Sequence, residues 1–276
     1  MSQARRSYPS DLTDQQWEII KDLIPAARSG GRPRTTNVRL VVNAVLYLTR
    51  TGCAWRYLPM EYPPPKTVYD YFSRWMCSGV WRKIHLTLAT QVRVADGRNK
   101  YPSTVIIDAQ SVRAQYGEER GWDGFKKVRG RKREILVDTL GILWGSKVHA
   151  ANQGENRRGF EAVDTYPVST PPARILGDNS YSKSPFDAQV YAKWKIWPTT
   201  KKSTRTFIKG KYGSYINTVE SSNLKPQRWI VERSFAWFNN HRRLARDYER
   251  KVSNSETLLY ISQIPILLNR LVFQPP

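Results

Sequence analysis

The chain has 276 residues, a length that fits one or two domains, and it carries 45 lysines and arginines against 23 acidic residues. Its net charge of +22 predicts a polyanionic partner, and basic residues exceed acidic ones both before and after residue 100. Aromatic residues make up 12% of the sequence, which excludes a disordered basic protein.

The two cysteines, Cys53 and Cys77, form neither a CxxC motif nor a zinc-binding spacing with the three scattered histidines. We expect both to be reduced, buried thiols in a reducing compartment, which predicts a cytoplasmic protein. The amino terminus lacks the apolar core of a signal peptide. The most apolar late stretch, Leu258–Val272, is interrupted by polar residues and Pro265, so the sequence predicts no membrane partner.

The first hundred residues have the pattern of short amphipathic helices. Thr13–Gln16 is a capping box before an apolar helix, and Asn37–Arg50 predicts a second helix with one apolar face. After a rigid run of prolines, Thr67–Asp70 has the form of another capping box and predicts a third helix. A fourth helix is expected over Val80–Val94. We therefore predict an all-α domain over residues 1–100.

Short helices, tight turns and a basic exposed face favour a helix-turn-helix domain that binds DNA. A plain helical bundle that serves in dimerisation or as a scaffold is the alternative. On the third helix, the exposed side would present Lys66, Tyr69, Ser73 and Arg74. The loop before the second helix carries Arg32 and Arg34, which could lie in an A·T minor groove. Because short Arg/Pro loops are common, a loop without DNA contact is the alternative there.

From residue 101 onward the pattern changes to strands. Strands are expected at 103–110, 134–138, 142–150 and 174–176, with a short fifth at 196–198, a weak helix at 159–166 and a long helix at 226–249. Three antiparallel strands, a helix, a parallel strand and a final helix favour a ribonuclease-H-like mixed α/β core. We therefore predict a catalytic domain over residues 101–276.

Three carboxylates lie beside apolar runs, where burial makes an unpaired charge costly. Asp108 follows Val105–Ile107, Asp178 follows Ile175–Gly177, and Glu232 lies inside a mostly apolar segment. If the three converged they would repel one another, and a divalent metal would remove that repulsion. In α/β sheets, sites form at the carboxyl ends of parallel strands, where both aspartates are expected.

Oxygen ligands without cysteine or histidine select Mg²⁺ or Mn²⁺ over zinc. Two such ions, about 3.5–4 Å apart, would serve phosphoryl transfer by activating the attacking oxygen and stabilising the leaving oxygen. Asp108, Asp178 and Glu232 are therefore the candidate catalytic residues and metal ligands. In a chain this basic, a carboxylate metal site predicts phosphate chemistry on nucleic acid.

The helix around Glu232 has a polar face, and steps of three and four residues place on it Arg228, Glu232, Ala236, Asn239 and Arg243. The small residue in the middle would leave room for a backbone phosphate. We therefore predict DNA contacts from Arg228, Asn239 and Arg243, with Arg242 beside them. A surface ion pair between Arg228 and Glu232 is the alternative for that pair.

Three further polar residues lie near the predicted site. Asp138 could be a fourth ligand, or an aspartate that starts a turn. His149 could contact DNA or the attacking water, or could have a structural role, and Asn179 could support Asp178.

A basic run over Lys126–Arg133 has two interpretations: a solvated hairpin face, or a face that follows the phosphate backbone through Lys126, Lys127 and Arg131. Nearby, Trp122 lies in a loop flanked by glycines. It could stack on an unpaired base, or it could belong to an ordinary loop.

Several of these residues lie in longer motifs, namely T-V-I-I-D-A-Q-S-V at 104–112, G-R-K-R-E-I-L-V-D-T-L-G at 130–141, V-H-A-A-N at 148–152, G-D-N-S-Y at 177–181, R-W-I-V-E-R-S-F-A-W-F from 228, R-R-L-A-R-D-Y-E from 242, L-T-D-Q-Q-W from 12 and R-T-G-C-A-W-R-Y-L-P at 50–59. Through them the chain resembles bacterial insertion-sequence transposases of the DDE type, in the insertion-sequence family five group. The resemblance spans nearly the whole chain.

The resemblance implies a transposase in which Asp108, Asp178 and Glu232 hold two Mg²⁺ ions, for which Mn²⁺ can substitute. It implies double-stranded DNA as partner, both element ends and target, with a homodimer or larger assembly on DNA, in the bacterial cytoplasm with the nucleoid. The related motif has a tyrosine, an arginine, the glutamate and a lysine at fixed steps. Here Lys225 stands at the tyrosine position and Asn239 at the lysine position.

Two other functions are compatible with the same residues. A domesticated protein could bind DNA without catalysis, although the intact set of three carboxylates argues against that. A stand-alone nuclease could cut strands without joining them.

Overall fold

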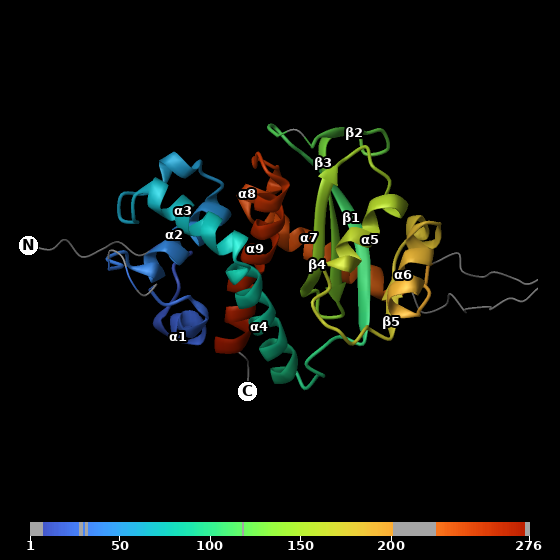
Figure 1. Cartoon of the computed structure of the whole chain (residues 1–276), viewed down its shortest axis with the longest axis horizontal. Coiled ribbons are helices and arrows are strands. Elements are labelled where there is room, and N and C mark those ends of the chain that lie inside the picture. Colours follow the sequence, from blue (N-terminus) through green and yellow to red (C-terminus); the bar gives the residue numbers. More distant parts are fainter. Residues whose placement is uncertain (1–7, 28–29, 31–32, 118, 201–224, 274–276) are drawn as a thin grey trace, which may run out of the picture. The chain divides into compact units, whose positions relative to one another are not determined.

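The computed structural model describes residues 8–27, 30, 33–117, 119–200 and 225–273 (Figure 1). The chain forms two compact units, of which the first combines residues 1–100 with 237–276 and the second comprises 101–236. The boundary after residue 100 lies where the sequence pattern changes from helices to strands. The carboxyl-terminal segment differs from the expected domain, because it packs with the amino-terminal helices and not with the sheet.

The first unit is all α, as predicted. Its helices are α1 (Asp14–Ile20), α2 (Val38–Thr51), α3 (Pro65–Cys77), α4 (Val80–Ala95), α8 (Arg242–Ala245) and α9 (Val252–Val272), with short 3-10 turns η1 (Lys21–Leu23) and η2 (Trp55–Tyr57). The capping box at α1 is confirmed, since Gln16 N donates to Thr13 Oγ1 at 3.2 Å and Thr13 N donates to Gln16 Oε1 at 3.0 Å.

The second predicted capping box is wrong. Helix α3 begins at Pro65, and its N-cap, Pro64, makes no side-chain hydrogen bond. A proline at the first helical position has a suitable φ and needs no partner for an N–H, so the helix starts before Thr67. Both cysteines are free thiols, but Cys77 is exposed and Cys53 half-buried, so the expected burial of the two is also wrong.

Helix α9 lies along α4 in the first unit. Pro265 lies inside it, and a proline in a helix interior costs about 3 kcal/mol. Each fully buried aliphatic side chain contributes roughly 1.5–3 kcal/mol. Because α9 buries Leu258, Leu259, Ile261, Ile264, Leu267 and Leu268, its packing outweighs the cost of the proline. Of the helices in the described ranges, α9 included, none is both long and apolar enough to cross a bilayer.

The second unit is a five-stranded mixed sheet with helices on both faces (Figure 1). Its elements are β1 (Thr104–Arg113), β2 (Gly121–Asp123), β3 (Val128–Asp138), β4 (Leu143–Ala150), α5 (Glu155–Asp164), β5 (Arg174–Leu176), η3 (Asn179–Ser182), α6 (Phe186–Trp194) and α7 (Lys225–Asn239). Strand β3 pairs antiparallel with β1, β2 and β4, while β5 runs parallel to β1.

Helix α7 is attached to the β3–β4 turn by two hydrogen bonds. Arg233 Nη2 donates to the carbonyl of Leu140 at 3.1 Å, and Ser234 Oγ donates to the carbonyl of Gly141 at 3.0 Å. The helix ends at Asn239, so the single helix expected over 226–249 is divided between α7 and α8. The expected strand at 196–198 is absent, and one parallel bridge between Leu176 and Thr199 lies there instead.

Candidate active site

Two of the predicted carboxylates, Asp108 and Asp178, lie at the same level of neighbouring strands. In the parallel pair of β1 and β5, Ile106 is opposite Leu176, and the two aspartates follow two residues later. Adjacent strands are about 4.8 Å apart. The register therefore places both half-buried aspartates two residues beyond the last paired position, Asp108 within β1 and Asp178 just after β5.

Backbone N–H groups fix both carboxylates. Asp108 Oδ1 accepts from the N–H of Ala109 at 2.8 Å. Asp178 is the N-cap of η3, and its Oδ1 accepts from the N–H of Ser180 at 2.8 Å. The backbone therefore holds one oxygen of each carboxylate in a fixed position.

Two further carboxylates, Glu134 and Glu155, belong to the same electrostatic environment. Burial raises the pKa of Glu155, and the charges of Glu134 and Asp178 raise it further, while Lys132 opposes the shift. Burial also raises the pKa of Tyr181 well above its usual range, with contributions from Glu134, Glu155 and Asp108. This end of the sheet is therefore strongly negative. Sequence reasoning missed Glu134, which precedes a buried apolar run, because attention went to carboxylates that follow one, as Asp108 does.

Three fully buried side chains, Glu134, His149 and Tyr181, form a hydrogen-bonded group that links the sheet to the turn that carries Asp178. Tyr181 Oη donates to Glu134 Oε2 at 2.6 Å, and Glu134 Oε1 lies 3.2 Å from His149 Nε2. The other ring nitrogen of His149 lies 3.0 Å from the carbonyl of Ala150. His149 is fully buried, which favours the structural interpretation of the two.

This buried group predicts the effect of Tyr181→Phe. The change keeps the ring but leaves one oxygen of Glu134 without its phenolic donor, and such a loss costs about 1–3 kcal/mol. We expect a free energy of unfolding lower by that amount, together with slower DNA cleavage because η3 carries Asp178. Tyr191→Phe, at an exposed tyrosine of the same unit, is the control for both measurements. An unchanged free energy of unfolding in Tyr181→Phe would show that the hydrogen bond between Tyr181 and Glu134 does not stabilise the fold.

Asp138 starts a turn and is not positioned as a ligand. Its Oδ1 accepts from the N–H groups of Leu140 at 2.9 Å and Ile142 at 3.0 Å. Its Oδ2 accepts from Trp144 Nε1 at 3.1 Å. Of the two interpretations left open by the sequence, the turn is therefore confirmed.

Glu232 is exposed on α7, and the structure does not include it in a three-ligand group with Asp108 and Asp178. Among the described residues, no three histidine, cysteine, aspartate or glutamate side chains are close enough to hold an ion. Asn239 is exposed as well, and the side chain of Arg228 lies outside the described residues.

Two predicted DNA contacts are wrong because their side chains are buried. Arg131 lies on β3 between two partner strands, and its Nε donates to the carbonyl of Glu119 at 3.2 Å. Arg243 lies on α8 and not on α7, and its Nε donates to Glu249 Oε1 at 2.8 Å. The sequence left open that the basic run forms one face, but in the structure Lys126, Lys127 and Arg129 are exposed, whereas residues 130–133 are buried.

Most of the DNA contacts predicted for the first unit are accessible to solvent, unlike Arg131 and Arg243. Lys66, Tyr69 and Arg74 are exposed on α3, whereas Ser73 is half-buried. Arg34 donates to two carbonyls of its own loop at 2.9 and 2.7 Å, which stabilises the loop. Arg32 lies outside the described residues. On α8, Arg242 is exposed.

Comparison with known proteins identifies relatives for both parts of the chain. Residues 12–85 match the family DUF4096, whose description names a transposase of the IS4/5 family. "Uncharacterized protein y4sN" of Sinorhizobium fredii is 35% identical over 103 residues, which are 37% of this chain and 76% of that protein. "Insertion element IS402 uncharacterized 16.2 kDa protein" of Burkholderia cepacia is 29% identical over 110 residues, which are 37% and 73% of the two chains.

Residues 100–264, more than half of the chain, match the family described as transposase DDE domain. That domain has the ribonuclease-H-like fold predicted from the strand pattern, and the mixed sheet of the second unit agrees with it. The chain therefore belongs to the transposase DDE domain family and is a transposase of the IS4/5 type.

Proposed function

We propose that this transposase binds the ends of its insertion sequence, cuts the DNA strands with water and joins the 3′ hydroxyls to target DNA. The observation that carries the proposal is the placement of Asp108 beside Asp178 within the matched domain. The net charge of +22 supports DNA as the partner. A homodimer or larger assembly on DNA, in the cytoplasm with the nucleoid, completes the proposal.

The residues at this end of the sheet fit a hard divalent cation. Asp108 and Asp178 supply oxygen donors of the kind that Mg²⁺ prefers. Two amide oxygens next to them in sequence, Gln110 Oε1 and Asn179 Oδ1, are buried without a hydrogen-bond partner among the described residues. We propose that Asp108, Asp178 and Glu232 hold two Mg²⁺ ions, which would activate water and stabilise the leaving oxygen.

The carboxylates also make DNA entry depend on bound cations. Two like charges 4 Å apart repel by about 1 kcal/mol in water and about 4 kcal/mol at an effective dielectric constant near 20. A phosphodiester would approach Asp108, Asp178 and Glu155 together, with the buried charge of Glu134 behind them. The protein without cations is therefore expected to exclude the scissile phosphate from this end of the sheet, while other surfaces still bind DNA.

Helix α3 is the proposed DNA-reading element of the first unit. Lys66 has a side chain that is 90% exposed, and its pairing with Asp70 at 3.4 Å is a surface ion pair that a phosphate can replace. Arg74, eight residues after Lys66 on the same helix, is exposed as well. In the second unit, Lys126 and Lys127, with Arg228 one turn before Glu232, are proposed to contact the DNA backbone near the cut. Asn239 and Arg242, in the carboxyl-terminal part of the first unit, are proposed to contact the DNA backbone as well.

The double variant Lys66→Ala/Arg74→Ala tests α3 in the full chain. Each lost phosphate contact should reduce the slope of log K against log salt by about 0.9, so the two together should reduce it by about 1.8. Lys83→Ala, at an exposed lysine of α4, is the matched control. An unchanged slope in the double variant, measured by titrating DNA at several salt concentrations, would remove α3 from the interface.

A cleavage and joining assay distinguishes this proposal from its alternatives. The substrate is a duplex with the inverted repeats that flank the coding region, incubated with the full chain and Mg²⁺. Cleavage followed by joining to a second duplex is expected, with Ca²⁺ permitting binding but no cleavage. Cleavage without joining would identify a nuclease, and binding without cleavage a silent DNA-binding protein.

A further inference from the structure

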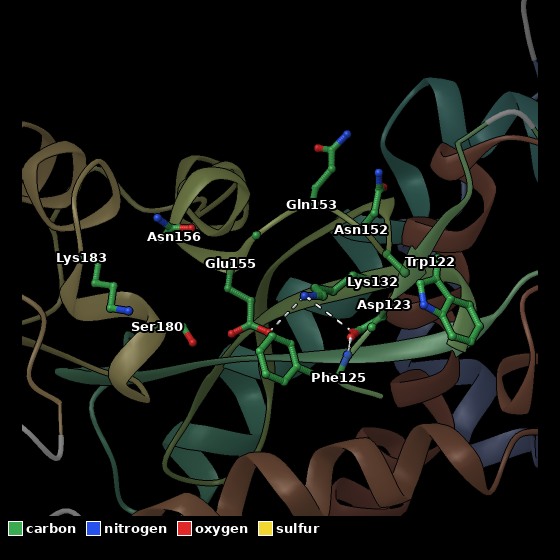
Figure 2. Close-up of a pocket in the computed structure, with 13 residues that line it drawn as sticks. Trp122, Asp123, Phe125, Lys132, Asn152, Gln153, Glu155, Asn156, Ser180 and Lys183 are labelled. Carbon is green, nitrogen blue, oxygen red and sulfur yellow. Dashed lines mark hydrogen bonds and ion pairs between the residues drawn. The ribbon is translucent and has the colours of Figure 1, made fainter. Parts of the chain in front are cut away.

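A pocket of about 560 Å³ opens beside Asp178, and nothing in the proposed reaction uses it. Its walls come from β2 and the following turn, from the segment between β4 and α5, and from η3. Figure 2 shows Lys132 between Asp123 and Glu155, with Trp122 at one end and Lys183 at the other. Sites for small ligands commonly have volumes of about 300–1,000 Å³.

The floor of the pocket is a buried ammonium held in a fixed position. The side chain of Lys132 is only 10% exposed, and its Nζ lies 3.3 Å from Glu155 Oε1 and 3.9 Å from Asp123 Oδ2. Asp123 is held in turn by Ser111 Oγ at 2.5 Å. The floor therefore offers a donor next to carboxylate acceptors, in a place from which water is largely excluded.

The rim carries two large aromatic side chains exposed to solvent. Trp122 is 56% exposed and Phe125 is 100% exposed. The turn that carries Phe125 is held by Asp123, whose Oδ1 accepts from the N–H groups of Phe125 and Lys126, both at 3.0 Å. Apolar rings held at the mouth of a polar pocket offer stacking surfaces to a flat ligand.

We propose that this pocket binds one unpaired nucleotide of the DNA strand next to the cut, with its base stacked on Trp122 or Phe125. The proposal rests on the proposed function and adds a subsite to it. Ser180 lines the pocket and lies two residues after Asp178, so a strand that passes the aspartates reaches the pocket within a short distance.

The mixture of donors and acceptors favours a base over a phosphate alone. A phosphate only accepts hydrogen bonds and would meet the carboxylate of Glu155, whereas a base edge both donates and accepts. Lys132 and Glu155, with the amide of Asn152 at the rim, provide both kinds of partner. In a duplex that edge is paired and stacked, so the occupant must be unpaired.

The test compares two DNA probes with the full chain in Ca²⁺ buffer. Both carry the terminal sequence of the element, one as a blunt duplex and the other with a single-stranded extension of a few nucleotides beyond the cut position. Stacking of one base contributes about 1–3 kcal/mol. We therefore expect Trp122→Ala to reduce the preference for the extended probe by about tenfold, without changing affinity for the blunt probe.

Trp197→Ala is the matched control, since Trp197 is a tryptophan of the same unit with a similar exposed fraction, 58%. As a second readout, extended probes with 5-iodouracil at single positions should crosslink on irradiation to the peptide that contains Trp122 and Phe125. The inference is overturned if both probes lose affinity equally, if the control behaves like Trp122→Ala, or if the crosslinks fall elsewhere. A wild-type chain that binds neither probe would overturn the proposed function as well, whereas normal cutting without a preference for the extension overturns only the subsite.

Discussion

Asp108→Asn and Asp178→Asn are expected to lower the rate of strand cleavage at least about a thousandfold. Each change keeps the side-chain shape but removes a negative charge from a proposed cation ligand, and cation stabilisation of the reacting oxygens accounts for several kcal/mol. Every 1.36 kcal/mol lost changes the rate tenfold. Glu232→Gln is expected to behave in the same way. The measurement is single-turnover cleavage of an end-sequence duplex in Mg²⁺.

DNA affinity should be retained in these variants, because the proposed reading surface lies on the first unit. Asp164→Asn is the matched control, since Asp164 is an aspartate of the same unit whose side chain is 64% exposed. The control should cut at the wild-type rate. Near wild-type cutting by either Asp108→Asn or Asp178→Asn would exclude that residue from the chemistry.

Glu249→Ala is expected to destabilise the first unit by about 3–5 kcal/mol. Glu249 and Arg243 form a buried ion pair, with side chains 5% and 7% exposed and 2.5 Å between Arg243 Nη2 and Glu249 Oε1. Removing one partner of such a pair leaves an uncompensated charge in the interior. For a unit of this size, a loss of 3–5 kcal/mol lowers the melting temperature by roughly 6–20 °C.

An exposed ion pair of the same unit provides the comparison. Asp14 pairs with Arg39 Nη1 at 2.6 Å, but its side chain is 91% exposed. Asp14→Ala should therefore cost no more than about 1 kcal/mol. If thermal unfolding showed equal losses for the two variants, the burial of the Arg243–Glu249 pair would have no energetic consequence.

The sequence predicted those features that depend on local pattern. Helices α1 to α4 follow from apolar periodicity, and strands β1, β3 and β4 follow from short apolar stretches bounded by turn residues. The juxtaposition of Asp108 and Asp178 was also predictable, because both follow apolar runs that form neighbouring parallel strands.

Features that depend on contacts between distant parts of the chain could not be predicted from the local sequence pattern. The charge of Arg131 gives no sign that β3 is the central strand, with partners on both sides. Arg243 looked like a continuation of the Glu232 face, since nothing local shows that α7 ends at Asn239. For α9, nothing local shows that the helix packs against α4 and not against the sheet.

The most direct test of the central claim replaces Mg²⁺ by Fe²⁺ and uses the bound ion to cleave the polypeptide near it. With ascorbate and peroxide, hydroxyl radicals form at the ion and cut the backbone within a few residues of its ligands. If Asp108, Asp178 and Glu232 hold the ions, three sets of fragments are expected, with ends near these residues, and excess Mg²⁺ should suppress them. Fragments that end near Asp138 instead, or cuts that Mg²⁺ does not suppress, would contradict it.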